Sequence, residues 1–297
     1  MSVPSCCGDM KNNGTHEDRL KDRLIPHEIL EGLDANFIGS SLHLFDELVS
    51  TNLTAHEMAV SGAQEGTVVL ADSQSEGRGR RGRSWFSPPG DNIYTSVILH
   101  PPVSPEKAPQ LTLVAAVALA ETISFFLNEA SQAEPGLKAE IKWPNDILIG
   151  GKKCAGILTE MKAHAGEVQY VVVGIGINVN LDSQYMPEEI SAIATSLSSA
   201  TGRDFKRGRI IQSLYSNMEN WYKRYLDKGF PFIRERWNNL SAVNGHYVKA
   251  ASPSIKNDGY EEGLALGIND KGALEMRKKD GRIMEISAGE ITLVSAG

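Results

Sequence analysis

The sequence predicts an α+β fold, in which a large mixed β-sheet is covered by helices and is followed by a small β-barrel. Two observations lead to this prediction. Apolar, β-branched stretches typical of strands are interspersed with two long helical stretches over most of the chain. After Trp237 the pattern changes to short alternating strands separated by Gly and Asp turns. The length of 297 residues fits one large and one small domain, since domains usually have roughly 100–200 residues.

The N-terminal elements are short. Residues 1–24 are expected to form a mobile tail, because they lack the apolar core of a secretory signal and are too acidic for a transit peptide. Residues 26–34 are expected to form a helix and His43–Phe45 a strand. The polar turn at residues 50–52 is expected to cap a helix that begins near Ala55.

The central part supplies the large sheet and its helices. Gly150 and Gly151 interrupt one of its strand stretches. Leu111–Glu129 is apolar on most faces, which predicts a helix buried against the sheet, and Gly208–Asp227 has apolar residues at helical spacing. Together these elements predict a domain from residue 25 to residue 240. The five strand stretches are Thr67–Ala71, Asn92–Leu99, Ala139–Lys142, Ile147–Thr159 and Val168–Ile177.

Residues 241–297 are expected to form the small β-barrel domain. The sequences at 269–272 and 279–281 contain the Asn, Asp and Gly residues typical of hairpin turns. The expected strands are Tyr247–Ala250, Gly263–Ile268, Ala273–Arg277, Ile283–Ile286 and Ile291–Val294.

Composition excludes several classes of function. The net charge of −7 argues against extensive binding to nucleic acid or to anionic membranes, so neither is expected as a partner. No uninterrupted apolar run reaches the roughly 18 residues of a membrane span. Three cysteines and seven scattered histidines form neither a disulfide framework nor a metal-ligand pattern, which indicates a reducing, cytoplasmic environment.

The most informative segment is the basic loop, residues 74–85, which carries four arginines and one glutamate in an acidic chain. Its glycines allow main-chain N–H groups to approach an anion closely, and its arginines supply forked donors for phosphate or carboxylate. Gly77, Gly79 and Gly82 also fit the spacing of a dinucleotide-binding turn. That turn must lead into a helix, however, and the prolines at 88 and 89 prevent one. A solvated basic loop without function is the remaining alternative.

Five motifs in order resemble those of biotin protein ligases. The segment GRGRRGRSWFSPPGDNIYTSV, residues 77–97, is similar to the signature loop of that family. The others are the polar turn at 50–52, KWPND at 142–146, KCAGIL at 153–158 and GIGIN at 174–178. The resemblance is strong over residues 40–180 and continues into the C-terminal part. It implies the biotin/lipoate ligase type of catalytic domain followed by an SH3-like barrel.

The resemblance implies an ATP-dependent, AMP-forming biotin–protein ligase. Biotin and ATP are then substrates, Mg²⁺ accompanies ATP, and the partner is the biotin carboxyl carrier protein of acetyl-CoA carboxylase or a related carboxylase. A homodimer is also expected. About 40 residues precede the polar turn, too few for the N-terminal DNA-binding domain of some members, so a monofunctional enzyme without DNA binding is expected.

The resemblance also assigns roles to individual residues. Lys153, Arg78 and Arg80 are the catalytic candidates, because fixed positive charge stabilises an anionic transition state. Asp146 is the candidate Mg²⁺ ligand. The expected biotin-binding residues are Ser50, Thr51, Asn52, Gln74, Gly77, Arg78, Gly79, Arg80, Trp85, Lys153, Gly156, Gly174 and Gly176. The expected ATP-binding residues are Arg78, Arg80, Arg81, Trp85, Lys142, Asn145 and Asn178.

Three alternatives remain at this stage. A lipoate or octanoate ligase would share the fold and the activation chemistry. A nucleic-acid-binding module would use the basic loop and bind in a salt-sensitive manner. A catalytically inactive biotin sensor would keep residues 50–52 and Gln74 but lose the ATP motifs, which are present here.

Overall fold

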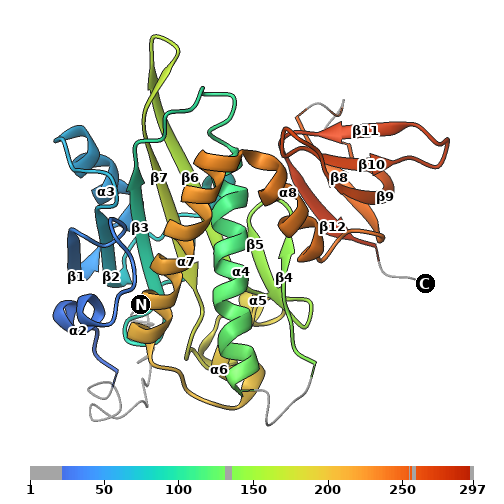
Figure 1. Ribbon diagram of the computed structural model, residues 1–297. Helices are drawn as coiled ribbons and strands as arrows, with labels where there is room; N and C mark the ends of the chain where they lie inside the picture. The colour runs from blue at the N-terminus through green and yellow to red at the C-terminus, as the bar shows by residue number, and fades with distance from the viewer. Residues whose placement is uncertain (1–21, 131–135, 254, 256–258, 295–297) are drawn as a thin grey trace, which may run out of the picture.

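The computed structural model describes residues 22–130, 136–253, 255 and 259–294. Seven strands form one sheet in the order β1-β2-β3-β7-β6-β5-β4 (Figure 1). β1 and β2 are parallel and all other neighbours are antiparallel, so the predicted mixed sheet is confirmed. The strands are β1 (Leu42–Leu48), β2 (Val68–Gln74), β3 (Ile93–Leu99), β4 (Ala139–Lys142), β5 (Asp146–Ile149), β6 (Lys152–His164) and β7 (Glu167–Ile177).

Two glycines create the tight hairpin between β5 and β6. Gly150 and Gly151 have φ angles of 56° and 78°, in the left-handed region that side chains disfavour. The stretch predicted as one interrupted strand is therefore two antiparallel strands. This turn brings Asp146 opposite Gly156 and Leu148 opposite Lys153.

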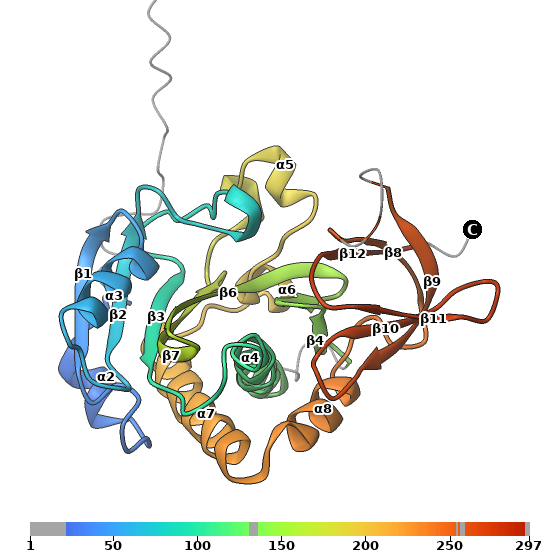
Figure 2. The ribbon, with the colours of Figure 1, turned by 90° about the horizontal axis from the view of Figure 1, so that it is seen from above.

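Two layers of helix cover one face of the sheet. α4 (Gln110–Ala130) lies against the sheet, and α7 (Arg207–Lys228) and α8 (Phe230–Asn239) pack on α4 (Figures 1 and 2). α4 has the length and mean hydropathy, 1.8, of a possible membrane span, although no uninterrupted apolar run predicted one. Its most apolar window is 78% buried between the sheet and α7, as in the core helix of a globular domain. α8 was not predicted; Gly229 ends α7 and Pro231 lies in the first turn of α8.

The remaining helices are short. α2 (Pro26–Glu31) confirms the first predicted helix, and α3 (Thr51–Val60) begins four residues before the predicted start at Ala55. Ser50 is the N-cap residue, but its side chain makes no capping hydrogen bond. The polar turn therefore supplies the N-cap residue as predicted, but without a side-chain hydrogen bond. The others are η1 (Arg80–Gly82), η2 (Ser183–Tyr185), α5 (Glu188–Ser191) and α6 (Leu197–Thr201).

The C-terminal residues form a second, five-stranded antiparallel sheet in the order β11-β10-β9-β8-β12. The predicted boundary near residue 240 falls in the connection between α8 and β8. That connection adds to the edge of the large sheet, since Ile141 N–H donates to Leu240 O and Ala242 N–H donates to Ile141 O. One buried apolar core includes residues of both sheets. The strands are β8 (Tyr247–Ala251), β9 (Glu261–Ile268), β10 (Leu274–Arg277), β11 (Ile283–Ile286) and β12 (Glu290–Leu293).

Most of the predicted N-terminal tail, residues 1–21, lies outside the described residues. Of its last three residues, Leu24 is buried in the core and Asp22 forms an ion pair with Arg207. These contacts fix the chain to α7 immediately before α2, so the expected mobility does not extend to residues 22–24.

Glu219 of α7 ties the segment before β1 to the helix layer. Its carboxylate, only 2% exposed, accepts hydrogen bonds from the backbone N–H groups of Asn36, Phe37 and Ile38. Burial alone would raise the pKa of this carboxyl, yet the hydrogen bonds from Lys223, from backbone N–H groups and from the Asn36 side chain lower it to about 2.

Glu219→Gln is therefore expected to lower the free energy of unfolding by about 3 kcal/mol at neutral pH. Because the folded-state pKa is depressed below the ordinary value of 4.5, this stabilisation is complete well above pH 4.5 and disappears as the pH falls towards 2. Urea unfolding of both proteins at several pH values measures the difference. The exposed Glu235 on α8 provides the control, Glu235→Gln. A constant difference between Glu219→Gln and wild type from pH 7 to pH 3 would contradict the prediction.

Candidate functional site

A cavity of about 370 Å³ lies on the face of the sheet opposite α4. Its floor is formed by the middle of β6 and β7, and its cover by the basic loop, the α5 region and β12. Figure 2 shows η1, α5 and β12 around the end of β6, on the side away from α4. The cavity thus lies where the large sheet, two connecting segments and the second sheet meet.

One end of the cavity is lined mainly by neutral polar side chains. Gln74 Oε1 accepts hydrogen bonds from the backbone N–H of Thr51 at 2.9 Å and from the Thr51 hydroxyl at 3.2 Å. Asn52 Nδ2 donates to Leu158 O and to Glu160, at 3.1 and 2.8 Å. The hydroxyl of Ser96 lies 2.7 Å from Asn52 Oδ1. These contacts fix the amides and hydroxyls in place before a ligand binds.

Glycines of β6 and β7 make the floor flat. A Cβ atom at Gly174 would lie 1.9 Å from Asn52 Oδ1, and one at Gly176 would lie 2.6 Å from the Trp85 ring. A Cβ at Gly156 would lie 3.0 Å from the same ring. Trp85 therefore packs directly on the main chain of the floor, which larger residues would prevent.

The other end of the cavity is charged. Lys153 Nζ lies 2.7 Å from Asp146 Oδ1 and 5.1 Å from the centre of the Trp85 ring. Burial lowers the pKa of Lys142 and that of Arg80, while the charge of Asp146 acts in the opposite direction on both. This end is therefore suited to an anion that can replace Asp146 as the partner of these cations.

Asn145 and Asn178 connect the charged end to its surroundings. Asn145 Nδ2 donates to Ile157 O at 2.8 Å, and its Oδ1 accepts from Arg80 Nη1 at 3.0 Å. Asn178 Nδ2 donates to Thr195 O at 3.0 Å. Both side chains are thus oriented by protein contacts at the cavity wall.

The basic loop is held at both sides of the cavity. Arg78 Nη2 lies 3.3 Å from Glu160 of β6, while Arg83 forms an ion pair with Glu290 of β12. Arg80 Nη2 donates to Gly289 O at 3.3 Å, just before β12. The loop therefore connects the large sheet to the second sheet across the cavity.

The structure brings the predicted site residues together, with two exceptions. Gly77 lies at the base of the basic loop, where its carbonyl accepts from Trp85 N–H at 2.8 Å, and it does not line the cavity. Arg81 is exposed in a left-handed conformation, with φ 56°, and does not line it either. The predicted residues that line the cavity are Ser50, Thr51, Asn52, Gln74, Arg78, Gly79, Arg80, Trp85, Lys142, Asn145, Asp146, Lys153, Gly156, Gly174, Gly176 and Asn178.

Sequence reasoning missed two groups of cavity residues and two supporting side chains. The supporting side chains are Ser96 and Glu160. Neither is marked by its local sequence as a ligand-binding residue, because each supports the site by contacting Asn52, which is far away in the sequence. Outside the five motifs, the missed lining residues are Leu181, Met186, Ile190, Ile193 and Ala194 around α5, and Glu290, Ile291 and Thr292 of β12.

Asp146 is the only predicted metal ligand, and its surroundings bear on that prediction. Within the described residues, no group of three or more His, Cys, Asp or Glu side chains is placed to hold a metal ion. A Mg²⁺ ion that takes most of its ligands from phosphate oxygens and water needs only one or two carboxylates. Asp146 fits that type of site and not a site built from protein ligands alone.

Comparisons with known proteins agree with this geometry. The model of the Biotin/lipoate A/B protein ligase family matches residues 45–178. The bifunctional ligase/repressor BirA of Bacillus spizizenii is 42% identical over 271 residues, which cover 91% of this chain and 79% of BirA. The biotin–[acetyl-CoA-carboxylase] ligase of Mycobacterium tuberculosis is 30% identical over 284 residues, covering 93% and 98% of the two chains.

A solved structure shows the same arrangement of chain. The biotin protein ligase from Aquifex aeolicus in complex with biotin and ATP superposes with a TM-score of 0.69 at 30% sequence identity. The superposition covers 86% of this chain and 100% of that chain. The similarity therefore extends over both sheets and not only over the region of the motifs.

Proposed function

This chain belongs to the biotin protein ligases of the Biotin/lipoate A/B protein ligase family, and we propose how its cavity performs their reaction. The chain activates biotin with ATP and transfers it to a lysine of a carboxylase carrier domain. The observation that carries this proposal is a single cavity that joins a neutral polar end, at Thr51 and Gln74, to a cationic end, at Lys153 and Lys142.

The neutral end suits the ureido ring of biotin, which has both N–H donors and a carbonyl acceptor. Hydroxyl and amide groups satisfy both, whereas a charged group would not. The floor at Gly174 and Gly176 carries no side chains, so that Asn52 and Trp85 lie directly on its main chain and can contact a bound ring system. The biotin carboxylate then extends towards Lys153.

The cationic end brings two anions together. A biotin carboxylate oxygen attacks the α-phosphorus of ATP, and pyrophosphate leaves as the new anhydride bond forms. Lys153 stabilises the charge that develops on these oxygens, and Arg80 and Lys142 reduce the repulsion between carboxylate and triphosphate. In the second step the acceptor amine attacks the biotinyl carbonyl carbon, AMP leaves, and an amide is formed.

Mg²⁺ is expected to bind together with the phosphates of ATP. When bound, it would neutralise phosphate charge, with Asp146 as its one carboxylate. Asp146 also lies 2.7 Å from Lys153 Nζ through its Oδ1, so the same carboxylate would stand between the ion and Lys153.

We also propose the cytoplasm as its location and a homodimer as its assembly. β1 lies at one edge of the large sheet, whereas β4 at the other edge is extended by Ser241. An edge strand is suited to pairing with a carrier domain or a second copy. Nucleic acid is not part of the proposal, because Arg78, Arg80 and Arg83 contact protein groups around the cavity.

Biotin-dependent exchange of labelled pyrophosphate into ATP tests the proposed function. We expect exchange with biotin, and none above background with lipoate or octanoate, because the neutral end supplies groups for a ureido ring. Labelling of a purified carboxylase carrier domain with biotin then tests the transfer step. Exchange with lipoate or octanoate alone would reassign the substrate within the same fold, and silence with all three acids would refute the adenylation chemistry.

A further inference from the structure

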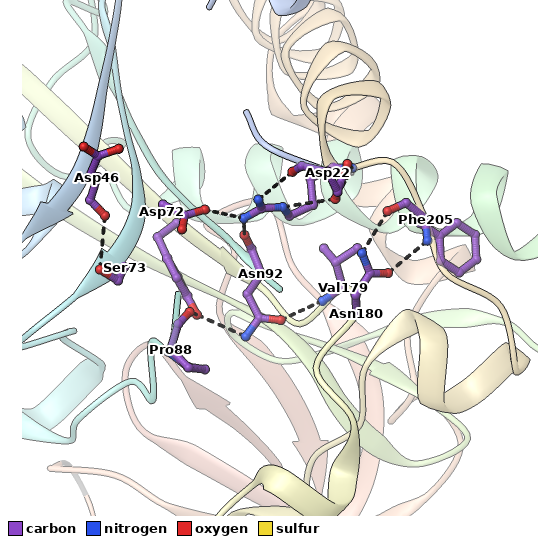
Figure 3. A network of polar contacts seen from close by, with 11 residues as sticks. Asp22, Asp46, Asp72, Ser73, Pro88, Asn92, Val179, Asn180 and Phe205 are labelled. Carbon is purple, nitrogen blue, oxygen red and sulfur yellow. Dashed lines mark hydrogen bonds and ion pairs between the residues drawn. The ribbon is translucent and has the colours of Figure 1, made fainter. Parts of the chain in front are cut away.

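A buried polar network lies behind the cavity wall, between two of the segments that form it. Asn92, wholly buried immediately before β3, has its side chain between Pro88 and Val179 (Figure 3). Its Oδ1 accepts from Val179 N–H at 3.0 Å, and its Nδ2 donates to the Tyr94 hydroxyl at 3.0 Å. The Tyr94 hydroxyl in turn donates to Pro88 O at 2.9 Å. One amide thus holds two segments that are far apart in the sequence.

Both segments belong to the site. Pro88 comes three residues after Trp85, and the intervening Ser87 donates to Trp85 O and accepts from Gln74. Val179 directly follows Asn178, a cavity residue. The Asn92–Tyr94 pair therefore sets the position of the Trp85 cover relative to the Asn178 wall without lining the cavity itself.

Arg207 holds the main chain at Asn92 in place. Its side chain, 1% exposed, donates to Asn92 O at 3.1 Å and to Asp72 at 2.7 Å, and also to Asp22 O at 2.7 Å. Figure 3 shows Asn92 between Asp72 and Val179. Arg207 of α7 thus connects Asn92 to β2 and to the N-terminal segment. Because these contacts fix the Asn92 backbone, its side chain is held in one orientation towards Val179 and Tyr94.

We propose that Asn92 and Tyr94 are positioning residues that hold Trp85 over the cavity floor and thereby retain the biotinyl adenylate until the acceptor lysine arrives. The inference rests on the proposed function. The adenylate is a mixed anhydride, which water destroys by attacking the biotinyl carbonyl carbon and releasing AMP and biotin. Exclusion of water by a closed cover prevents this loss. Without the Tyr94 hydroxyl, the Pro88 carbonyl loses its buried donor and the cover is free to shift.

Tyr94→Phe tests the proposal, with Tyr215→Phe as a matched control. Tyr215 of α7 is also wholly buried, and its hydroxyl lies 2.7 Å from Thr95 Oγ1. That hydrogen bond joins β3 to the helix layer and does not involve Pro88 or Val179. Each variant loses one buried hydroxyl and its hydrogen bonds. Both are expected to lower the midpoint of thermal unfolding, whereas only Tyr94→Phe is expected to change adenylate retention.

The measurement is AMP formation from ATP and biotin without acceptor, beside biotin-dependent pyrophosphate exchange. For Tyr94→Phe we expect exchange close to wild type and AMP formation faster by roughly three- to tenfold, the range of one buried hydrogen bond. Tyr215→Phe should match wild type in both assays. Asn92→Asp, which lacks the amide donor and can draw the Tyr94 hydroxyl away from Pro88, should change AMP formation in the same direction.

Equal AMP formation in Tyr94→Phe and Tyr215→Phe would overturn the positioning role, because a loss of stability alone would then explain both variants. AMP formation at the wild-type rate in Tyr94→Phe and Asn92→Asp would overturn it as well. Failure of the proposed function is distinguishable, since wild type would then show no biotin-dependent exchange at all.

Discussion

Replacement of Lys153 by alanine is expected to lower the rate of biotin-dependent pyrophosphate exchange by about 10²–10³-fold, the typical cost of removing one preorganised stabilising group. The ammonium group at the charged end of the cavity, 2.7 Å from Asp146, would be lost. The oxygens of the attacking carboxylate and the α-phosphate would then lack this fixed positive charge. Asp146 would also lose its partner and add repulsion towards the triphosphate.

The adjacent lysine provides the control for this variant. Lys152 is exposed, and its Nζ donates to Ser191 O at 3.3 Å outside the cavity lining. Lys152→Ala removes the same side chain one position earlier in β6 and should leave the exchange rate near that of wild type. A similar loss in both variants would show that the effect comes from the strand and not from the charge at the cavity. Near-normal exchange in Lys153→Ala would remove Lys153 from the chemistry.

Gly174→Ala is expected to weaken biotin binding by at least about tenfold, because small displacements at a binding site are costly. The added Cβ would lie 1.9 Å from Asn52 Oδ1. Asn52 has little freedom to move away, since its amide is fixed by Leu158 O, Glu160 and Ser96. Either the amide or β7 must shift, and both form the neutral end. Isothermal titration with biotin, without ATP, measures the change.

Gly208→Ala in α7 is the matched control for Gly174→Ala. The nearest atom to a Cβ at Gly208 is 4.0 Å away, on Ile29, so the methyl group has room. Alanine also favours a helix over glycine, by about 1 kcal/mol, so this variant should be at least as stable as wild type. It should bind biotin normally. Unchanged biotin affinity in Gly174→Ala would mean that the ligand does not use the Asn52 end of the floor.

The strands were predictable from sequence because most of them are buried on both faces or alternate clearly. β4 has the predicted bounds, and β2, β3 and β7 differ from prediction by only a few residues at their ends. β1 was predicted shorter than it is, because Asp46 and Glu47 interrupt its apolar character at the edge of the sheet. The start of α3 was predicted too late. Thr51 and Asn52 are polar, which predicted a turn, but they form the first turn of the helix, and their polar side chains line the cavity.

The site was predictable as far as local motifs describe it. The glycines, Lys153 and the basic loop each lie in a short segment whose composition suggests ligand binding. Glu290 and Glu160 could not be found in this way. Their importance comes from pairing with Arg83 and Arg78 across the cavity, and such contacts depend on the tertiary fold.

The participation of β12 in the cavity has a consequence for the synthesis of the protein. The wall includes Thr51 near one end of the described chain and Thr292 near the other. A ribosome therefore completes Lys153 and the glycine floor long before it completes Glu290, the partner of Arg83. Before β12 has emerged to pair with β8, the cavity must lack the part of its wall that β12 supplies. The wall around Lys153 can therefore be completed only at the end of translation.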